Sequence, residues 1–148
     1  MRSLQRGITL LELTIVITLI GLLASMAIPA LGIYVERARN NRTIGEIGRV
    51  SIELYRFRLN NGGVFPDTLA EAGIDLDADP WGNPYTYVNL AGGGGPARTS
   101  GGDPVNTDFD LYSNGPDGAT ADDVGEPDSA DDIVRAANGA FLGIAADL

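Results

Sequence analysis

The stretch that decides the fold lies near the start of the chain, where residues 6–35 read RGITLLELTIVITLIGLLASMAIPALGIYV. Residues 8–28 form a run of 21 mostly apolar residues, long enough for a helix to cross a hydrocarbon core of ~30 Å. Glu12 lies near the start of this run, and no further charge follows until Glu36. A carboxylate at the bilayer centre costs about 2.5–3.5 kcal/mol on insertion scales. Glu12 therefore requires compensation.

Acidic residues are concentrated in the last third of the 148-residue chain, whose net charge is −10. Residues 101–148 carry eleven Asp and Glu against Arg135 alone, whereas residues 1–100 carry nine of each sign. This distribution argues against a nucleic-acid groove there, and for a solvated acidic face or a cation site. The chain has no Cys and no His, which excludes disulfides, thiolate or histidine-ligated metal centres and most catalytic triads. We therefore expect that the protein is not an enzyme and has no catalytic residues.

The N-terminal stretch is compatible with two ordinary targeting segments. One is a signal anchor preceded by Arg2 and Arg6. The other is a secretory signal cut after Ser-Met-Ala at residues 25–27. The second is weakened by Glu12, because a charge at the start of the apolar region hinders insertion.

A third interpretation explains more of the stretch. Residues 6–13, RGITLLEL, resemble the type III signal of the type IV pilin superfamily. In that family a short basic leader is cut after Gly, the new N-terminus is methylated, the fifth processed residue is Glu, and the twenty-second is Pro. Here cleavage would follow Gly7, Ile8 would be the N-methylated first residue, and Glu12 and Pro29 would take those two positions. Ile8 stands where the family usually has Phe. We favour this interpretation because both registers agree.

The resemblance implies roles in assembly for Glu12 and Pro29. In a filament, the Glu12 carboxylate of one subunit would neutralise the α-ammonium group of its neighbour. Opposite charges attract strongly at low dielectric, and either charge alone is costly there. The alternative is that Glu12 extends to the headgroups without such a partner. Pro29 is expected to kink or locally melt the turn at residues 25–29, so that the long helix can bend.

Residues 34–60 continue the helical pattern. Apolar residues recur at helical spacing with Arg and Glu between them, at Ile44, Ile47, Val50, Leu54 and Phe57. We expect this stripe to lie against a small sheet, and the Asn and Gly residues at 60–63 to end the helix. A short helix is expected next, capped by Asp67 and closed by Gly73.

The pattern then changes to that of strands. Residues 85–90 and 108–113 predict two strands, joined by the glycine-rich loop 91–107. The four glycines at 92–95 are not followed by GK[ST], so we expect no nucleotide site.

Two further motifs narrow the family. Residues 79–85, DPWGNPY, resemble the signature of the major pseudopilins of the type II secretion system. In physical terms, the two prolines fix backbone angles, Gly82 permits a turn, and Trp81 offers a large apolar surface. Residues 110–118, DLYSNGPDG, followed by SADDI at 129–133, resemble the calcium loop of the same family.

The second resemblance implies calcium as a cofactor. Carried over residue by residue, it implies carboxylates from Asp117, Asp131 and Asp132, and a backbone carbonyl from Asn114, which stands where the family has Leu. Calcium takes six to eight hard oxygen ligands, which suits this set.

The calcium prediction leaves two alternatives open. The intervening segment is longer than in the family, so Asp122 and Asp123 compete with Asp131 and Asp132 for the paired role. A plain acidic surface loop is the other alternative. Without calcium, repulsion between the carboxylates is expected to loosen residues 113–133.

Together these features predict an α+β fold. A long N-terminal helix, transmembrane in its first half, is expected to pack on a small antiparallel sheet with long loops, as in type IV pilins. The expected organisation is a leader at residues 1–7, a transmembrane and assembly helix at 8–33, and a periplasmic pseudopilin domain at 34–148.

The resemblance implies a structural subunit of a periplasmic pseudopilus that drives type II protein secretion across the outer membrane. It implies a single-pass location in the inner membrane, with the C-terminal domain in the periplasm. The implied partners are copies of the same chain in a filament, other pseudopilins, inner-membrane secretion components and a prepilin peptidase, with no nucleic acid. Two alternatives stay open: a type IV pilin for adhesion, motility or DNA uptake, and a membrane-anchored calcium-binding domain that does not polymerise.

Overall fold

The computed structural model describes residues 7–148, apart from the side chains of residues 29 and 30. The chain divides into two compact units, one up to Ala38 and one from Arg39 to Leu148. A single helix, α1 (Leu10–Asn60), runs through both. The prediction that the membrane-length segment and residues 34–60 form one helix is confirmed.

The first unit consists of the N-terminal part of α1. Its described large apolar side chains between Leu10 and Val35 are exposed within the single chain. By length and composition this part of α1 is able to cross a membrane, as predicted. The backbone is helical without a break through residues 25–29, so the local melting expected there is not found. One missing N–H donor at a proline is tolerated when neighbouring helical turns stay paired.

The second half of α1 buries one face. Ile47, Val50 and Leu54 are fully buried, and Ile44 packs at the margin of the same core, which confirms these four residues of the predicted stripe. Phe57, the fifth, is only partly buried and is not part of this core. The helix ends at Asn60, and Gly63, with φ of 89°, donates its N–H to the Arg58 carbonyl at 2.9 Å. Positive φ is accessible to glycine without a Cβ penalty, which explains why the helix ends here.

The short helix predicted after residue 66 is wrong. Residues 67–73 form turns instead, in which Thr68 Oγ1 accepts the Glu71 N–H and Glu71 Oε2 accepts the Asp67 N–H. Asp67 is therefore not the capping acceptor. Gly73 closes the segment with φ of 69°, as predicted. So short a segment gains too few hydrogen bonds to offset helix nucleation.

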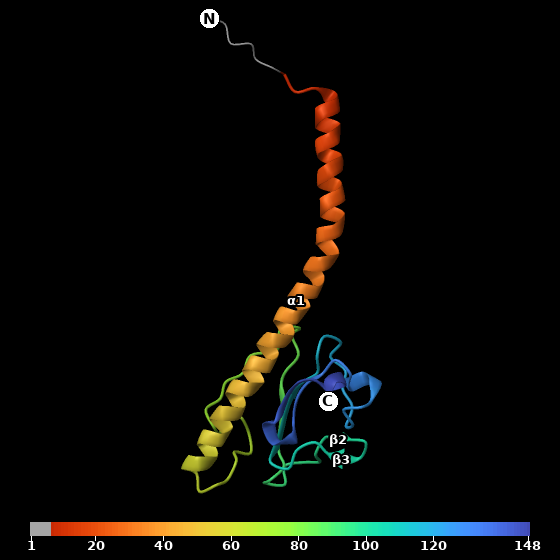
Figure 1. The fold of residues 1–148 in the computed structure, drawn as a ribbon. Helices are drawn as coiled ribbons and strands as arrows, with labels where there is room; N and C mark the ends of the chain where they lie inside the picture. Colours follow the sequence, from red (N-terminus) through yellow and green to blue (C-terminus); the bar gives the residue numbers. More distant parts are fainter. Residues whose placement is uncertain (1–6) are drawn as a thin grey trace, which may run out of the picture. The chain divides into compact units, whose positions relative to one another are not determined.

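The sheet has four antiparallel strands in the order β1-β4-β5-β6. Figure 1 shows strands beside the second half of α1. The strands of the sheet are β1 (Thr86–Asn89), β4 (Phe109–Ser113), β5 (Ile133–Ala136) and β6 (Phe141–Ile144). The first two confirm the strands predicted at 85–90 and 108–113, and they pair with each other. Strands β5 and β6 were not predicted.

Short elements complete the loops. The glycine-rich loop contains a ribbon of β2 (Thr99–Ser100) and β3 (Asp103–Pro104). Three 3-10 turns follow, η1 (Pro127–Ser129), η2 (Ala137–Gly139) and η3 (Ala145–Asp147).

The core lies between α1 and the four-stranded sheet. Leu54 and its neighbours on α1 pack with Phe65, Phe109 and Ile133. The rings of Phe65 and Phe109 meet edge to face, with centroids 5.1 Å apart, a favourable arrangement for aromatic pairs. A long helix packed on a small antiparallel sheet confirms the predicted α+β class.

Candidate functional site

The predicted cleavage site lies just outside the helix. Gly7, Ile8 and Thr9 precede α1 and have no regular structure, and the Ile8 side chain is 78% exposed. Thr9 Oγ1 accepts the N–H of Glu12 at 3.2 Å, which caps the first turn. A peptide bond outside the helix is open to a peptidase. Residues 1–6 of the predicted leader lie outside the described residues.

Glu12 is exposed among apolar side chains in the first turn of α1. No ion pair among residues 7–148 involves it. Its position near the positive end of the helix dipole stabilises the carboxylate modestly. The side chain of Pro29 lies outside the described residues. The assembly roles of both residues stay predictions.

The turn containing DPWGNPY is built around Asp79, which is buried. Asp79 Oδ1 accepts the N–H groups of Trp81 and Asn83 at 3.0 and 2.8 Å, and Oδ2 accepts the Ser113 hydroxyl at 2.6 Å. Asn83 Nδ2 then donates to the carbonyl of Gly115 at 2.8 Å. The motif is structural here, and it connects β1 to the turn that follows β4.

The two segments of the predicted calcium loop meet at one edge of the sheet. Strand β4 ends at Ser113 and β5 begins at Ile133, and these two residues pair. Asp131 Oδ2 consequently accepts the backbone N–H of Asp117 at 3.3 Å. Gly115, with φ of 66°, approaches the Asp131 carbonyl so closely that no Cβ would fit. Sequence positions far apart are thereby brought together, as the motif implied.

Asp132 has a different environment from Asp117 and Asp131. It is fully buried, and its Oδ2 accepts hydrogen bonds from Arg98 Nη2 and Thr120 Oγ1, each at 2.7 Å. Burial raises the pKa of the Asp132 carboxyl above its ordinary value, and the bonds from Thr120 and Arg98 oppose this rise. Sequence reasoning missed Arg98. One feature of the sequence could have drawn attention to Arg98: it is the one arginine between Arg58 and Arg135.

The competing pair, Asp122 and Asp123, is placed elsewhere in the loop. The Asp123 carboxylate accepts the N–H groups of Gly102 and Gly125 at 3.1 and 2.9 Å and the Thr99 hydroxyl at 3.1 Å. The bond from Gly125 is the main cause that lowers the Asp123 pKa. Asp122 is exposed, and its carbonyl accepts the Thr99 N–H. Asp123 thus holds the β2–β3 ribbon in place.

The fit of calcium can be tested on buried oxygens. No three acidic side chains among residues 7–148 are close enough to form a ready metal site. Two buried oxygens of the predicted ligand residues, Asn114 Oδ1 and Asp132 Oδ1, nevertheless lack hydrogen-bond partners. An unsatisfied buried acceptor costs about 1–3 kcal/mol, and a cation would remove that cost. The donor set, all hard oxygens, suits calcium.

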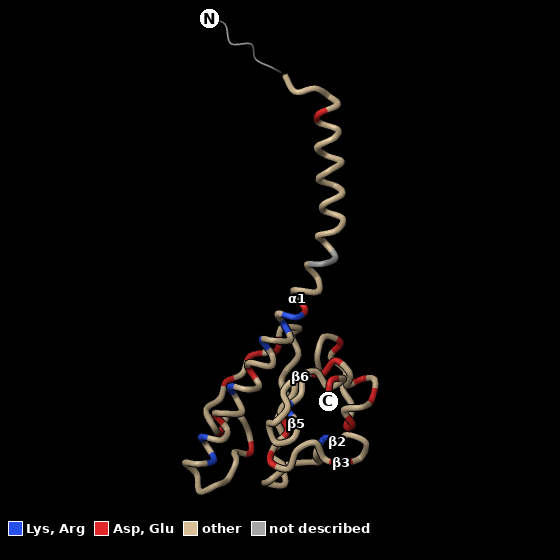
Figure 2. Tube along the Cα trace, viewed as in Figure 1, with Lys and Arg blue, Asp and Glu red and all other residues tan. Residues whose placement is uncertain are grey.

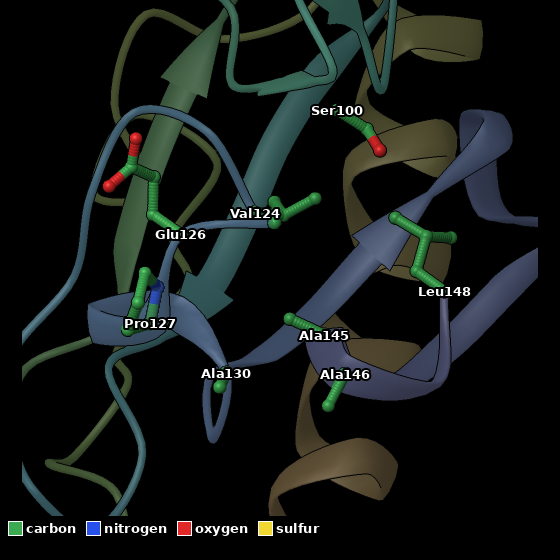
Figure 3. A pocket seen from close by; sticks show the side chains of 9 residues that line it. Ser100, Val124, Glu126, Pro127, Ala130, Ala145, Ala146 and Leu148 are labelled. Carbon is green, nitrogen blue, oxygen red and sulfur yellow. The ribbon is translucent and has the colours of Figure 1, made fainter.

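A shallow hollow of about 360 Å³ lies beside the acidic segment (Figure 3). It is lined by Ser100, Val124, Gly125, Glu126, Pro127, Ala130, Ala145, Ala146 and Leu148. Small apolar side chains dominate this lining. One hydroxyl and one carboxylate do not make an acid–base pair with a nucleophile, so the hollow suggests no chemistry.

Comparison with known proteins supports the pilin-like features. Residues 2–28 match a family model described as the prokaryotic N-terminal methylation motif. The chain is 34% identical to the type II secretion system core protein G of Escherichia coli strain K12, over 81% of this chain and 89% of that protein. It is 30% identical to the protein of the same name from Dickeya chrysanthemi, over 90% and 87%.

The chain belongs to the type II secretion system core protein G family. Similarity extends to a pilus protein as well: fimbrial protein Q of Moraxella bovis is 32% identical, over 75% of this chain but only 64% of that protein. The match covers 89% and 87% of the two core protein G relatives, so membership of that family is better supported than membership of a fimbrial family. No solved structure gives a significant match.

Family membership agrees with the geometry of the N-terminus. The methylation motif covers Gly7, Ile8, Glu12 and the whole apolar run at residues 8–28. None of these relatives has a name that refers to an enzyme; they are secretion-system core and fimbrial proteins. In this core protein G family member, the N-terminal helix is a candidate single-pass membrane anchor.

Proposed function

We propose that this chain is a structural subunit of a periplasmic pseudopilus that drives type II protein secretion across the outer membrane. The observation that carries this proposal is the 34% identity to core protein G over most of both chains. The single apolar N-terminal helix, joined to a small α+β unit, supports it. An isolated subunit exposes a long apolar helix, which needs a membrane or other helices around it.

The proposal includes location and processing. The helix resides in the inner membrane, and the unit from Arg39 to Leu148 resides in the periplasm. A prepilin peptidase cleaves between Gly7 and Ile8, and Ile8 is then N-methylated. The processed subunit joins copies of itself, other pseudopilins and inner-membrane secretion components. The exposed and irregular backbone at residues 7–9 supports the cleavage step.

Glu12 is proposed to pair with the N-terminus of the neighbouring subunit during assembly. The carboxylate is exposed and has no ion pair among residues 7–148, so it is available to a second chain. Leaving it unpaired among packed apolar helices is costly, and pairing removes that cost.

The test is complementation of a deletion strain with the wild-type chain, Glu12→Ala, or the control Thr14→Ala. Within residues 7–148, Thr14 Oγ1 donates to the carbonyl of Leu11 in its own helix, so we expect that variant to assemble. We expect Glu12→Ala to insert in the membrane, but to lose filaments by electron microscopy and to lose the secreted proteins. Filaments in Glu12→Ala would refute the pairing. A normal secretome in the deletion strain, with surface fibres lost, would favour a pilin role related to that of fimbrial protein Q.

Calcium is proposed as a structural cofactor of the acidic loop. Asp117, Asp131 and Asn114 would hold it at the edge of the sheet, with the free Oδ1 of Asp132 as a further oxygen. The convergence of the two segments and the two orphaned buried oxygens support this assignment. Bound calcium would neutralise the carboxylates and join the turn after β4 to the start of β5.

A further inference from the structure

Arg98 places a positive charge inside the acidic part of the unit from Arg39 to Leu148, which is called the outer unit below. Its Nη2 is surrounded by four oxygens: Thr120 Oγ1 at 3.1 Å, the Ala121 carbonyl at 3.0 Å, Ser129 Oγ at 2.9 Å and Asp132 Oδ2 at 2.7 Å. All four come from one stretch, residues 120–132. Nη2 carries two N–H groups, so the four oxygens share them, and the charge-assisted bond to Asp132 is the shortest of the four.

The charge is buried, and its side-chain hydrogen bonds all pass through Nη2; Nε and Nη1 have no hydrogen-bond partner among the described residues. Arg98 is 6% exposed, and both Ser129 and Asp132 are fully buried. The guanidinium lies over the Tyr112 ring, 4.2 Å from the centroid. Its backbone N–H donates to Asp110 Oδ2 at 2.8 Å, which anchors it to strand β4. A charge is found this deep only when it is paired and hydrogen-bonded.

The segment around Arg98 needs a cation. Residues 117–132 contain seven Asp and Glu and no Arg or Lys, and they have almost no regular structure beyond η1. Figure 2 shows acidic residues gathered in the lobe that ends at the C-terminus. Mutual repulsion favours opening of such a segment, since it buries little apolar area to offset that repulsion.

We infer that Arg98 is a built-in cation that holds residues 117–132 in their folded conformation independently of any bound metal. It joins Asp132 to Thr120, Ala121 and Ser129, so one side chain fastens both ends of the loop. This inference changes the expectation from the sequence, which was that residues 113–133 loosen without calcium. In chelator the loop keeps its fold, and it loses that fold when Arg98 is removed.

A second consequence rests on the calcium proposal above. Arg98 occupies one oxygen of Asp132, so Asp132 offers calcium only its second oxygen, Oδ1. Arg98 and calcium would neutralise the same segment from two sides. Removing Arg98 therefore makes the loop more dependent on calcium.

The test uses the full-length chain in detergent, with EGTA or with calcium. Arg98→Gln is compared with Arg98→Lys and with the control Arg56→Gln, which removes an equal charge from the exposed face of α1. Amide hydrogen exchange is measured over residues 117–132. In EGTA we expect the wild type to be protected, and Arg98→Gln to exchange about tenfold faster or more in this segment. Arg98→Lys recovers part of the protection, and Arg56→Gln exchanges as the wild type does.

The following results would overturn the inference about Arg98, test it by a second variant, or separate it from the calcium proposal. Unchanged exchange in Arg98→Gln in EGTA overturns the inference. If Arg98→Gln fails to fold, Thr120→Val decides: it removes one oxygen at similar volume and should speed exchange in residues 117–132 alone. If Arg98→Gln is loosened but calcium alters neither protein, the built-in cation stands and the calcium proposal fails.

Discussion

At the scale of single residues, buried Arg135 and partly exposed Asp108 form a second ion pair, separate from that of Arg98. Arg135 Nη2 donates to Asp108 Oδ2 at 2.6 Å, and Nη1 donates to Oδ1 at 2.9 Å. Tyr55 on α1 donates its hydroxyl to the same carboxylate at 2.6 Å. The guanidinium lies over the Phe109 ring, 4.0 Å from the centroid. The pair joins α1 to the sheet through polar contacts inside an apolar core.

The Asp108 pair predicts an acid-sensitive fold. Burial alone would raise the Asp108 pKa, but hydrogen bonds from Arg135, Tyr55 and the Phe109 N–H outweigh it and lower the pKa below its usual value. A lowered folded-state pKa contributes stability above the unfolded value of about 4, and that stability is lost as pH falls through the folded pKa. Urea unfolding at pH 7 to 2.5 should show the wild type losing stability below about pH 4.

The matched variants for this prediction are Asp108→Asn and Asp103→Asn, the latter on the exposed ribbon strand β3. We expect Asp108→Asn to be less stable at pH 7 and to show a shallower acid dependence, because no carboxylate is left at 108 to titrate. Asp103→Asn should follow the wild type. Equal acid slopes in Asp108→Asn and the wild type would exclude this carboxylate as the cause.

At the scale of elements, α1 is one helix in two environments. Its first part is mostly apolar, with Glu12 as its one charge before Glu36, and its second part has one buried face and one face with arginines and glutamates. Two exposed i,i+4 pairs, Arg42–Glu46 and Arg49–Glu53, lie on the outer face. Such pairs contribute only about 0.3–0.5 kcal/mol each, so the buried stripe stabilises this half.

Leu54 and Leu59 test that conclusion on the same helix. Leu54 is fully buried against the sheet, whereas Leu59 is 82% exposed near the helix end. Leu54→Ala should destabilise the outer unit by about 2–5 kcal/mol through lost burial and a cavity, while Leu59→Ala should change stability by no more than about 0.5 kcal/mol. Urea unfolding followed by the fluorescence of Trp81, the single tryptophan, measures both. Equal effects would mean that α1 does not depend on its buried stripe.

At the scale of the whole molecule, the chain combines a membrane-length helix with an outer unit that has its own core. The outer unit is small and has long loops, so we expect its stability to depend strongly on cations close to residues 117–132. Arg98 is one such cation in the structure, and calcium is the proposed second.

The calcium proposal predicts a ligand-dependent melt. Thermal unfolding of the full-length chain in detergent, followed by Trp81 fluorescence, should shift upward in calcium relative to chelator. A ligand that binds only the folded state adds about 2.7 kcal/mol at a hundredfold excess over its Kd. The shift should vanish in Asp117→Ala and persist in Asp122→Ala. A shift that persists in Asp117→Ala would place calcium elsewhere, and no shift in the wild type would refute the proposal.

Much of the fold could be predicted because it depends on local patterns. The apolar run, the stripe from Ile47 to Leu54 and the glycines after Asn60 predict α1 and its end. Strands β1 and β4 show β-type patterns of their own. The prediction of a helix at residues 67–73 was wrong because the helical signals of this segment are too weak to nucleate a helix alone. Strands β5 and β6 were missed because they are short, lie among Gly and Ala, and depend on pairing with β4.

The sequence by itself determined the membrane-length helix and the α+β class, since both follow from the spacing of apolar residues along the chain, and its first residues carry the resemblance to the methylation motif. Only the tertiary structure decided which charges are buried and paired. Arg98 lies 34 residues before Asp132 and Tyr55 lies 80 before Arg135, and no local pattern joins such positions. The folded sheet brings them together, and burial then makes each pairing strong, because water no longer competes for the charges.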